Sequence, residues 1–198
     1  MGNLKYTLVY VPEGNRSDSN ADVFDTADTL SIDEESEHLI DRYTQIVCGI
    51  SPKTTVCEFT SDSKDRSRIL DDFACGKLEV LTSMKCLDEG VDVPRSEMAI
   101  FCASTGNPRQ FVQRRGRILR KYPGKTIADI YDVVLLPKQC PDIAKIELKR
   151  VYEYAKVALN KTEIFQEIGD LLKNYNISIQ DIVNDNEDLN GGELDEWC

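Results

Sequence analysis

A cluster of basic side chains past the middle of the chain is the first feature that could carry chemistry. Seven bases and no acid lie between residues 109 and 125, namely Arg109, Arg114, Arg115, Arg117, Arg120, Lys121 and Lys125. Four arginines within seven residues repel one another unless an anion lies between them. On a helix, Arg117 and Arg120 face the same side, and each guanidinium can bind phosphate oxygens through two hydrogen bonds. Gly116 has no Cβ, which permits a ligand to approach closely. The spacing therefore predicts a phosphate-binding face, with a solvated basic helix as the alternative.

Hydroxyl side chains at the ends of predicted strands form a second group. Thr82 and Ser83 directly follow a predicted strand at 78–81, and Thr60 ends another at 54–60. Hydroxyl groups and nearby backbone N–H groups can bind the phosphates of a nucleic acid without reading its sequence. Thr82 and Ser83 are thus predicted nucleic-acid contacts, and Thr60 is a weaker candidate.

Five β-rich segments alternate with helical patterns over residues 4–136. The predicted strands are 4–11, 54–60, 78–81, 98–103 and 126–136, and the predicted helices are 31–47, 63–73 and 107–120. Such alternation is typical of an α/β domain whose parallel sheet has helices on both faces. Ligands of these domains bind beyond the carboxyl ends of the strands. The expected ligand loops are 12–30, 60–65, 82–95 and 104–109.

The pattern changes after Pro137, and it divides the chain. We predict a main domain at 1–137, in which 13–30 is a mobile acidic loop. Two amphipathic helices and a short third piece at 179–183 follow, in a helical extension assigned to 138–180. Residues 181–198 are predicted to be a flexible acidic tail. Whether the extension packs on the domain or binds a partner stays open.

The net charge of −11 over 198 residues comes from two acidic segments. Residues 13–41 carry −9 and residues 181–198 carry −7, so the rest of the chain carries +5. The overall charge excludes a uniformly basic coat protein but not a local basic site. The seven cysteines include no C-x-x-C pair, which predicts reduced, mostly buried thiols and no metal site. With no apolar span and no secretory leader in the sequence, we expect no membrane partner and a cytoplasmic, nucleoid or nuclear location.

Two stretches resemble motifs V and VI, in that order, of the C-terminal RecA-like domain of DEAD/DEAH-like superfamily-2 helicases. The first is LTSMKCLDEGVDVP at 81–94, and the second is QRRGRILR at 113–120, which has the Q-x-x-G-R-x-x-R form. LKYTLVYV at 4–11 is similar to the motif IV strand, and Thr60-Ser61-Asp62 is similar to motif IVa. The resemblance is nearer to the DNA-repair and restriction-type translocases than to the DEAD-box RNA group. It implies a RecA-like fold over residues 4–136.

The resemblance also implies roles in a nucleotide site. Arg117 and Arg120 would be arginine fingers on the γ-phosphate of ATP, with Gln113 near that phosphate or the attacking water. Gly90 would allow an unusual turn beside the nucleotide, and Asp92 would accept a hydrogen bond from a ribose hydroxyl.

Alternatives remain open at several positions. Arg114 and Arg115 lie elsewhere on the predicted helix, where a structural role and a contact with the DNA backbone are both possible. Thr82 could simply cap a strand end, and Asp92 could stabilise a turn through its side chain. For Thr60, a purely structural role is an equal alternative.

A complete helicase motor needs parts that this sequence lacks. It contains no G-x-x-x-x-G-K-[ST] loop for the phosphates of ATP, and neither of its acidic pairs fills the position that holds Mg²⁺. We therefore expect ATP and Mg²⁺ to be held mainly by an N-terminal RecA-like partner domain, with no appreciable ATPase from this chain alone. The expected second partner is nucleic acid, with DNA favoured over RNA. The alternative functions are a non-catalytic RecA-like protein-interaction module and an unrelated phosphate-binding α/β domain.

Overall fold

The computed structural model describes residues 4–12, 32–84, 93, 95–102 and 108–184. The chain divides into two compact units, Met1–Val133 and Val134–Cys198. The predicted acidic loop at 13–30 lies outside the described residues, and so does the tail from residue 185 onward. No helix among the described residues is long and apolar enough to cross a membrane.

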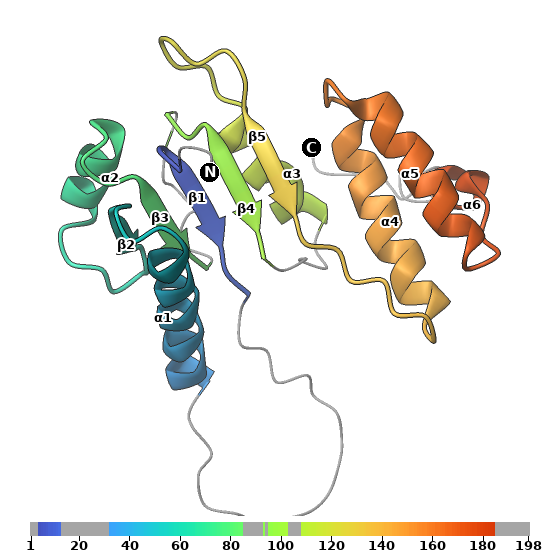
Figure 1. Cartoon of the computed structure of the whole chain (residues 1–198), viewed down its shortest axis with the longest axis horizontal. Helices are drawn as coiled ribbons and strands as arrows, with labels where there is room; N and C mark the ends of the chain where they lie inside the picture. Colours follow the sequence, from blue (N-terminus) through green and yellow to red (C-terminus); the bar gives the residue numbers. More distant parts are fainter. Residues whose placement is uncertain (1–3, 13–31, 85–92, 94, 103–107, 185–198) are drawn as a thin grey trace, which may run out of the picture. The chain divides into compact units, whose positions relative to one another are not determined.

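The first unit is built on a parallel sheet (Figure 1). Its described strands are β1 (Thr7–Tyr10), β2 (Val56–Glu58), β3 (Val80–Ser83), β4 (Met98–Phe101) and β5 (Asp129–Asp132), in the order β2-β3-β1-β4-β5. In the register of the sheet, Tyr10 lies between Ser83 and Phe101, and Phe101 pairs with Asp132. The carboxyl ends of the strands therefore meet at one edge, as the sequence predicts. The predicted parallel α/β fold is confirmed.

Helices cover both faces of this sheet. They are α1 (Ile32–Ile50), α2 (Arg66–Ala74) and α3 (Pro108–Ile118). Ile40 of α1 packs with Val9 and Val80, whereas the guanidinium of Arg114 on α3 lies over the ring of Tyr10. Successive side chains of a strand point to opposite faces, so α1 and α3 lie on opposite sides of β1. Figure 1 shows α1 in front of the sheet and α3 behind it.

The observed elements differ from the predicted ones at their ends. β3 covers 80–83 instead of 78–81, so Thr82 and Ser83 belong to the strand itself. Helix α2 begins at Arg66, not at Ser63, because the Ser63 hydroxyl accepts a hydrogen bond from the Thr60 backbone N–H at 2.8 Å. This contact makes a turn before the helix, a common alternative use of serine.

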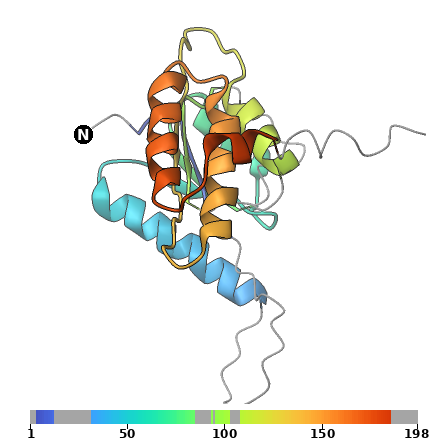
Figure 2. The same ribbon diagram turned by 90° about the vertical axis from the view of Figure 1, so that its right-hand side faces the viewer.

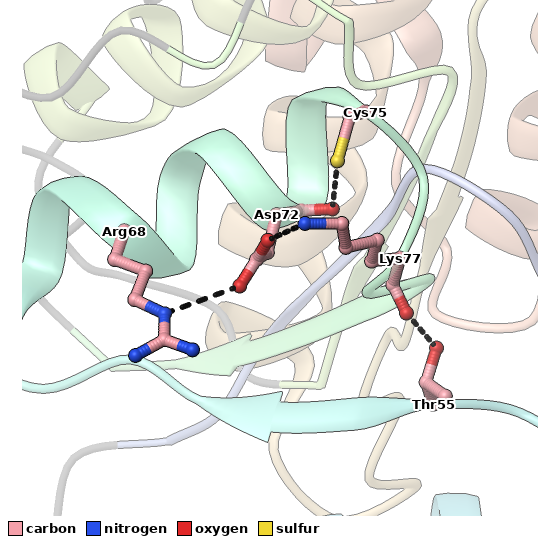
Figure 3. A network of polar contacts seen from close by, with 5 residues as sticks. All are labelled: Thr55, Arg68, Asp72, Cys75 and Lys77. Carbon is pink, nitrogen blue, oxygen red and sulfur yellow. Dashed lines mark hydrogen bonds and ion pairs between the residues drawn. The ribbon is translucent and has the colours of Figure 1, made fainter.

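A polar network joins the end of α2 to the start of β2 (Figure 3). The Asp72 carboxylate lies 2.9 Å from the Lys77 ammonium and 3.8 Å from Arg68 Nε. The Thr55 hydroxyl donates to the Lys77 carbonyl at 2.8 Å. Between them, Gly76 has φ +77°, a left-handed conformation that glycine adopts without a steric penalty. The predicted stop of this helix at Gly76 is thus confirmed.

The cysteines of the described part are free thiols, as expected, but two that were predicted to be buried are exposed. These two are Cys48 in the last turn of α1 and Cys75 just after α2, where the prediction of burial was wrong, and Cys140 just before α4 is a third exposed thiol. Cys57 and Cys102 are partly buried, and this burial raises the pKa of each thiol.

The second unit contains α4 (Pro141–Ala155), α5 (Lys161–Lys173) and α6 (Ile179–Asn184) among the described residues. Figure 2 shows α4 and α5 side by side, and the two helices share an apolar core. The buried members of this core are Leu148, Ile168, Leu172 and Ile182. The predicted helical pieces after Pro137 correspond to these three helices.

Candidate phosphate and nucleic-acid sites

The arginines of α3 fall into two groups. Arg114 is only 4% exposed, and its guanidinium lies 5.0 Å from the centre of the Tyr10 ring. Tyr10 stacks on Phe101 with 4.8 Å between ring centres, so α3 rests on an aromatic pair at the carboxyl edge of the sheet. Of the two roles left open for Arg114, this contact supports the structural one.

The predicted finger residues are accessible. Gln113 and Arg120 are exposed, and Arg117 is partly exposed. Gln113 and Arg117 are four residues apart on α3 and share a helical face, whereas Arg120 follows the helix, which ends at Ile118. A Cβ built on Gly116 would meet nothing within 4 Å, so no packing among the described residues requires glycine there. A ligand that needs the space beside Gly116 stays a prediction.

Lys125 is a residue of this site that the sequence reasoning missed. Its ammonium donates hydrogen bonds to the carbonyl of Ile118 and, at 3.0 Å, to that of Arg120. The side chain is half-buried, and this burial lowers the pKa of the Lys125 ammonium, an effect that the Glu97 carboxylate partly offsets. The only signal in the sequence was a lysine shortly after a helix end, where cations favour the carbonyl groups.

The end of α3 lies at the amino edge of the sheet. Tyr122, two residues after Arg120, has its ring 5.4 Å from the Arg95 guanidinium. Arg95 also lies 4.1 Å over the ring of Tyr6, which directly precedes β1. Arg120 is thus placed away from the carboxyl edge, where the sequence analysis expected all ligand loops.

The predicted nucleic-acid contacts Thr82 and Ser83 lie at the carboxyl edge and are fully buried. The hydroxyl oxygens of Thr82 and Thr44 are 2.7 Å apart, which joins β3 to α1. Thr44 also hydrogen-bonds to the Glu58 carboxylate. A hydroxyl has one proton, so while Thr44 donates to an ionised Glu58, Thr82 must donate to Thr44. A phosphate contact from the Thr82 hydroxyl would require this hydrogen bond to break.

Glu58 has an unusual environment for a carboxylate at a strand end. Burial raises the pKa of Glu58, the Thr44 hydrogen bond opposes that shift, and the neighbouring Asp41 carboxyl adds to it. The charged form of Glu58 is therefore disfavoured, although its hydroxyl partner stabilises it.

Thr60, Gly90 and Asp92 are the remaining residues predicted to belong to a site. Thr60 is half-buried and lies in the turn before α2, where its hydroxyl is 3.1 Å from that of Ser63. Gly90 and Asp92 lie outside the described residues, and their predicted contacts with the nucleotide stay predictions. Within the described part of the chain, no group of three or more His, Cys, Asp or Glu side chains could hold a metal ion.

The geometry thus defines a parallel α/β domain that presents basic side chains at and after the end of one helix and has hydroxyl side chains, two of them buried, at two strand ends. Residues 23–122, half of the chain, match the model of the helicase conserved C-terminal domain. The chain belongs to this family, and the prediction of a C-terminal RecA-like domain of a superfamily-2 helicase is confirmed.

Two curated relatives and one solved structure illustrate the similarity. The DNA 3'-5' translocase XPB2 of Sulfurisphaera tokodaii is 44% identical over 83 residues, which are 40% of this chain and 19% of that protein. The DEAD-box ATP-dependent DNA helicase Fancm of Drosophila melanogaster is 33% identical over 82 residues, 40% of this chain and 6% of that protein. The yeast DEAD-box splicing factor Prp28 shares the fold, with a TM-score of 0.50 and 10% identity over 96% of this chain and 32% of that chain. The chain therefore spans a fifth or less of the length of these two curated relatives.

Proposed function

We propose that this chain is the C-terminal half of an ATP-dependent nucleic-acid helicase or translocase. In this proposal, Arg117 and Arg120 are arginine fingers, and Gln113 orients the γ-phosphate or the attacking water. An N-terminal RecA-like domain supplies the phosphate-binding loop and the carboxylates for Mg²⁺. Two observations support this proposal, namely the family to which the chain belongs and the accessible side chains at the end of α3.

The single observation that carries the proposal is how α3 divides its arginines. Arg114 is buried against Tyr10 and anchors the helix, while Arg117 near the helix end and Arg120 just after it remain accessible. Two accessible guanidinium groups on an anchored segment suit the equatorial oxygens of a transferring phosphoryl group, whose negative charge spreads in the transition state. Arginine is the fitting residue because its planar fork binds oxygens in pairs.

The residues present fit ATP phosphates better than they fit a metal ion. Guanidinium and amide groups donate hydrogen bonds to anionic oxygens, whereas Mg²⁺ requires oxygen ligands such as carboxylates. In the bound state, Mg²⁺ would neutralise charge on the phosphates. Gly90 and Asp92 are proposed to contact the sugar of the nucleotide, and Gly116 to leave room for the phosphates beside Arg117.

For the nucleic acid we propose the carboxyl edge of the sheet. Thr60, Thr82 and Ser83 lie at or beside strand ends there, at the opposite end of the sheet from Arg120. Thr60 is the partly exposed member, whereas Thr82 and Ser83 are buried, and a phosphate contact from Thr82 requires its hydrogen bond to Thr44 to break. Two separate surfaces suit a motor, because ATP and nucleic acid must be bound at the same time. DNA is favoured over RNA because the translocase and the helicase among the curated relatives act on DNA by their names.

ATP turnover tests the proposal, measured on the protein that also carries the N-terminal RecA-like domain. Arg117→Ala is expected to lower kcat by roughly 10³–10⁵-fold, with nucleic acid still bound. Lys173→Ala, which removes an exposed cation from α5, is the matched control and is expected to leave turnover unchanged. Unchanged turnover in Arg117→Ala would refute the role of the finger. The isolated chain is expected to show no appreciable turnover in the same assay.

The second candidate is a non-catalytic RecA-like module that binds protein partners. No contact among the described residues singles it out, and the accessible pair Arg117 and Arg120 counts against it, since such a module needs neither. If the protein that carries the N-terminal domain shows no ATP turnover, this candidate replaces the first.

A further inference from the structure

The end of helix α3 is stabilised by a side chain from the loop that follows it. The last carbonyl groups of a helix have no partner within the helix. Here the Lys125 ammonium donates to two of the carbonyls at this end, those of Ile118 and Arg120. The Lys125 backbone N–H donates to the Tyr122 carbonyl at 3.0 Å, which closes the loop into a turn. We call Lys125 and these two carbonyl groups the Lys125 clasp.

The turn that carries Lys125 is itself held in place. The Tyr122 ring lies beside the Arg95 guanidinium, which also covers the Tyr6 ring. Arg95 donates to the Ala74 carbonyl at 2.5 Å, at the end of α2. The loop after α3 is therefore joined to the starts of β1 and β4 and to the end of α2. These contacts restrain the backbone of the turn from which the Lys125 side chain reaches the two carbonyl groups.

Arg120 depends on this donor more than Arg117 does. Helix α3 ends at Ile118, so Arg120 lies two residues beyond the last helical position. The Arg120 backbone N–H reaches the Arg117 carbonyl at 3.3 Å, a long hydrogen bond. Residues just past a helix end fray readily unless a cap holds them.

We propose that Lys125 is a positioning residue that holds the proposed finger Arg120 in place. The inference rests on the proposed function of Arg120, and it adds a residue that the motif itself does not include. A guanidinium must be held within a fraction of an ångström to act on a transition state, and small displacements are costly. The clasp supplies that restraint through the backbone of Arg120, without contacting the ATP.

Charge makes lysine suitable for this role. The helix end carries partial negative charge from its carbonyl groups, which favours a cation there. Burial opposes the charged form of Lys125, so the carbonyl contacts and the Glu97 carboxylate offset a real cost of placing an ammonium there. A neutral side chain of the same length leaves the two carbonyls without this donor.

The first test needs only the chain itself and the variant Lys125→Met. Amide hydrogen exchange at Leu119 and Arg120 is expected to become about tenfold faster, because hydrogen bonds from a charged donor are lost. The control is Lys121→Met, which removes an exposed lysine from the same loop. Equal exchange in wild type and Lys125→Met would overturn the clasp. Circular dichroism checks that each variant is folded, and Lys125→Arg, which keeps a cationic donor, is expected to restore slower exchange.

The second test is ATP turnover in the protein that carries the N-terminal domain. Lys125→Met is expected to lower kcat by on the order of 10²-fold with little change in KM. In an Arg120→Ala background, the same substitution is expected to have no further effect on kcat. A merely structural role predicts equal effects in both backgrounds, and that result would overturn the proposal. If Arg120→Ala alone leaves kcat unchanged, the proposed function of Arg120 has failed, which is a different result from failure of the clasp.

Discussion

The buried guanidinium of Arg114 offers a direct test of how the basic helix is held on the sheet. Arg114→Met keeps an unbranched side chain in the same space but removes the cation over the Tyr10 ring. A desolvated cation–π contact contributes about 2 kcal/mol, and at 4% exposure the Arg114 side chain is desolvated. We therefore expect Arg114→Met to lower the free energy of unfolding by about 2 kcal/mol.

Arg114→Ala separates the charge from the packing. It removes two further methylene groups from a buried site, each worth about 0.8 kcal/mol, so its total loss should approach 4 kcal/mol. In thermal unfolding, the loss for Arg114→Met corresponds to a decrease in Tm of roughly 6–10 °C for a unit of this size. Arg115→Met on the same helix is the control, because Arg115 is partly exposed and a loss within about 0.5 kcal/mol is expected.

The assay is guanidinium-induced unfolding followed by circular dichroism, with Tyr10→Leu added to complete a double-mutant cycle. Because the cation–π interaction requires the Tyr10 ring, Arg114→Met should lower the free energy of unfolding much less in the Tyr10→Leu background than in the wild type. If Arg114→Met is as stable as the wild type, while Arg114→Ala loses only the methylene contribution, the guanidinium adds nothing and the reasoning is wrong.

Two further predictions concern the sheet and its edges. Gly76→Ala is expected to lower the free energy of unfolding by at least about 1–2 kcal/mol, because φ is +77° and a Cβ would lie 2.7 Å from both Lys5 Cε and the Tyr6 hydroxyl oxygen. Urea unfolding measures this, and Gly49→Ala, whose Cβ would meet nothing within 4 Å, should cost nothing. For Glu58, whose folded pKa is raised mainly by burial, the associated stability is present below the unfolded value of about 4.3 and is lost as the pH rises through the folded pKa. Across this pH window, the free energy of unfolding should decrease less with rising pH in Glu58→Gln than in the wild type. An identical pH dependence of this free energy in both proteins would contradict the raised pKa of Glu58.

The predictions for Arg114 and for Lys125 concern different properties of α3. The contact of Arg114 with Tyr10 concerns how α3 is anchored, whereas the Lys125 clasp concerns where its last turn points. The two contacts involve different groups, a side chain on the Tyr10 ring and the carbonyl groups at and after the helix end, so their effects on stability and on turnover should be separable. A loss of turnover with unchanged stability would indicate the clasp, and a loss of both would indicate the anchor.

Much of the architecture follows from local sequence patterns. Alternating β-rich and helical segments predict the parallel sheet and its helices, because side-chain periods of two and of 3.6 residues are read within a few residues. The same holds for the placement of Gln113 and Arg117 on one side of a helix, whereas the helix ends at Ile118, before Arg120. The stop of α2 at Gly76 is also local, since it depends on the backbone freedom of one residue.

The contacts that distinguish these residues were decided only by the tertiary structure. Sequence spacing could not tell which arginine of α3 is buried, because the answer depends on Tyr10, which the strand register brings beside Phe101. It also could not show that the Thr82 hydroxyl is bound by Thr44, 38 residues away, or that Lys125 reaches back to Arg120. A local pattern sets which side chains share a face, but burial and hydrogen-bond partners come from segments that are distant in sequence. The sequence alone therefore determined the family and the candidate residues. The packing of the sheet against α1 and α3 decided which candidate side chains are buried, which are held by hydrogen bonds and which remain accessible.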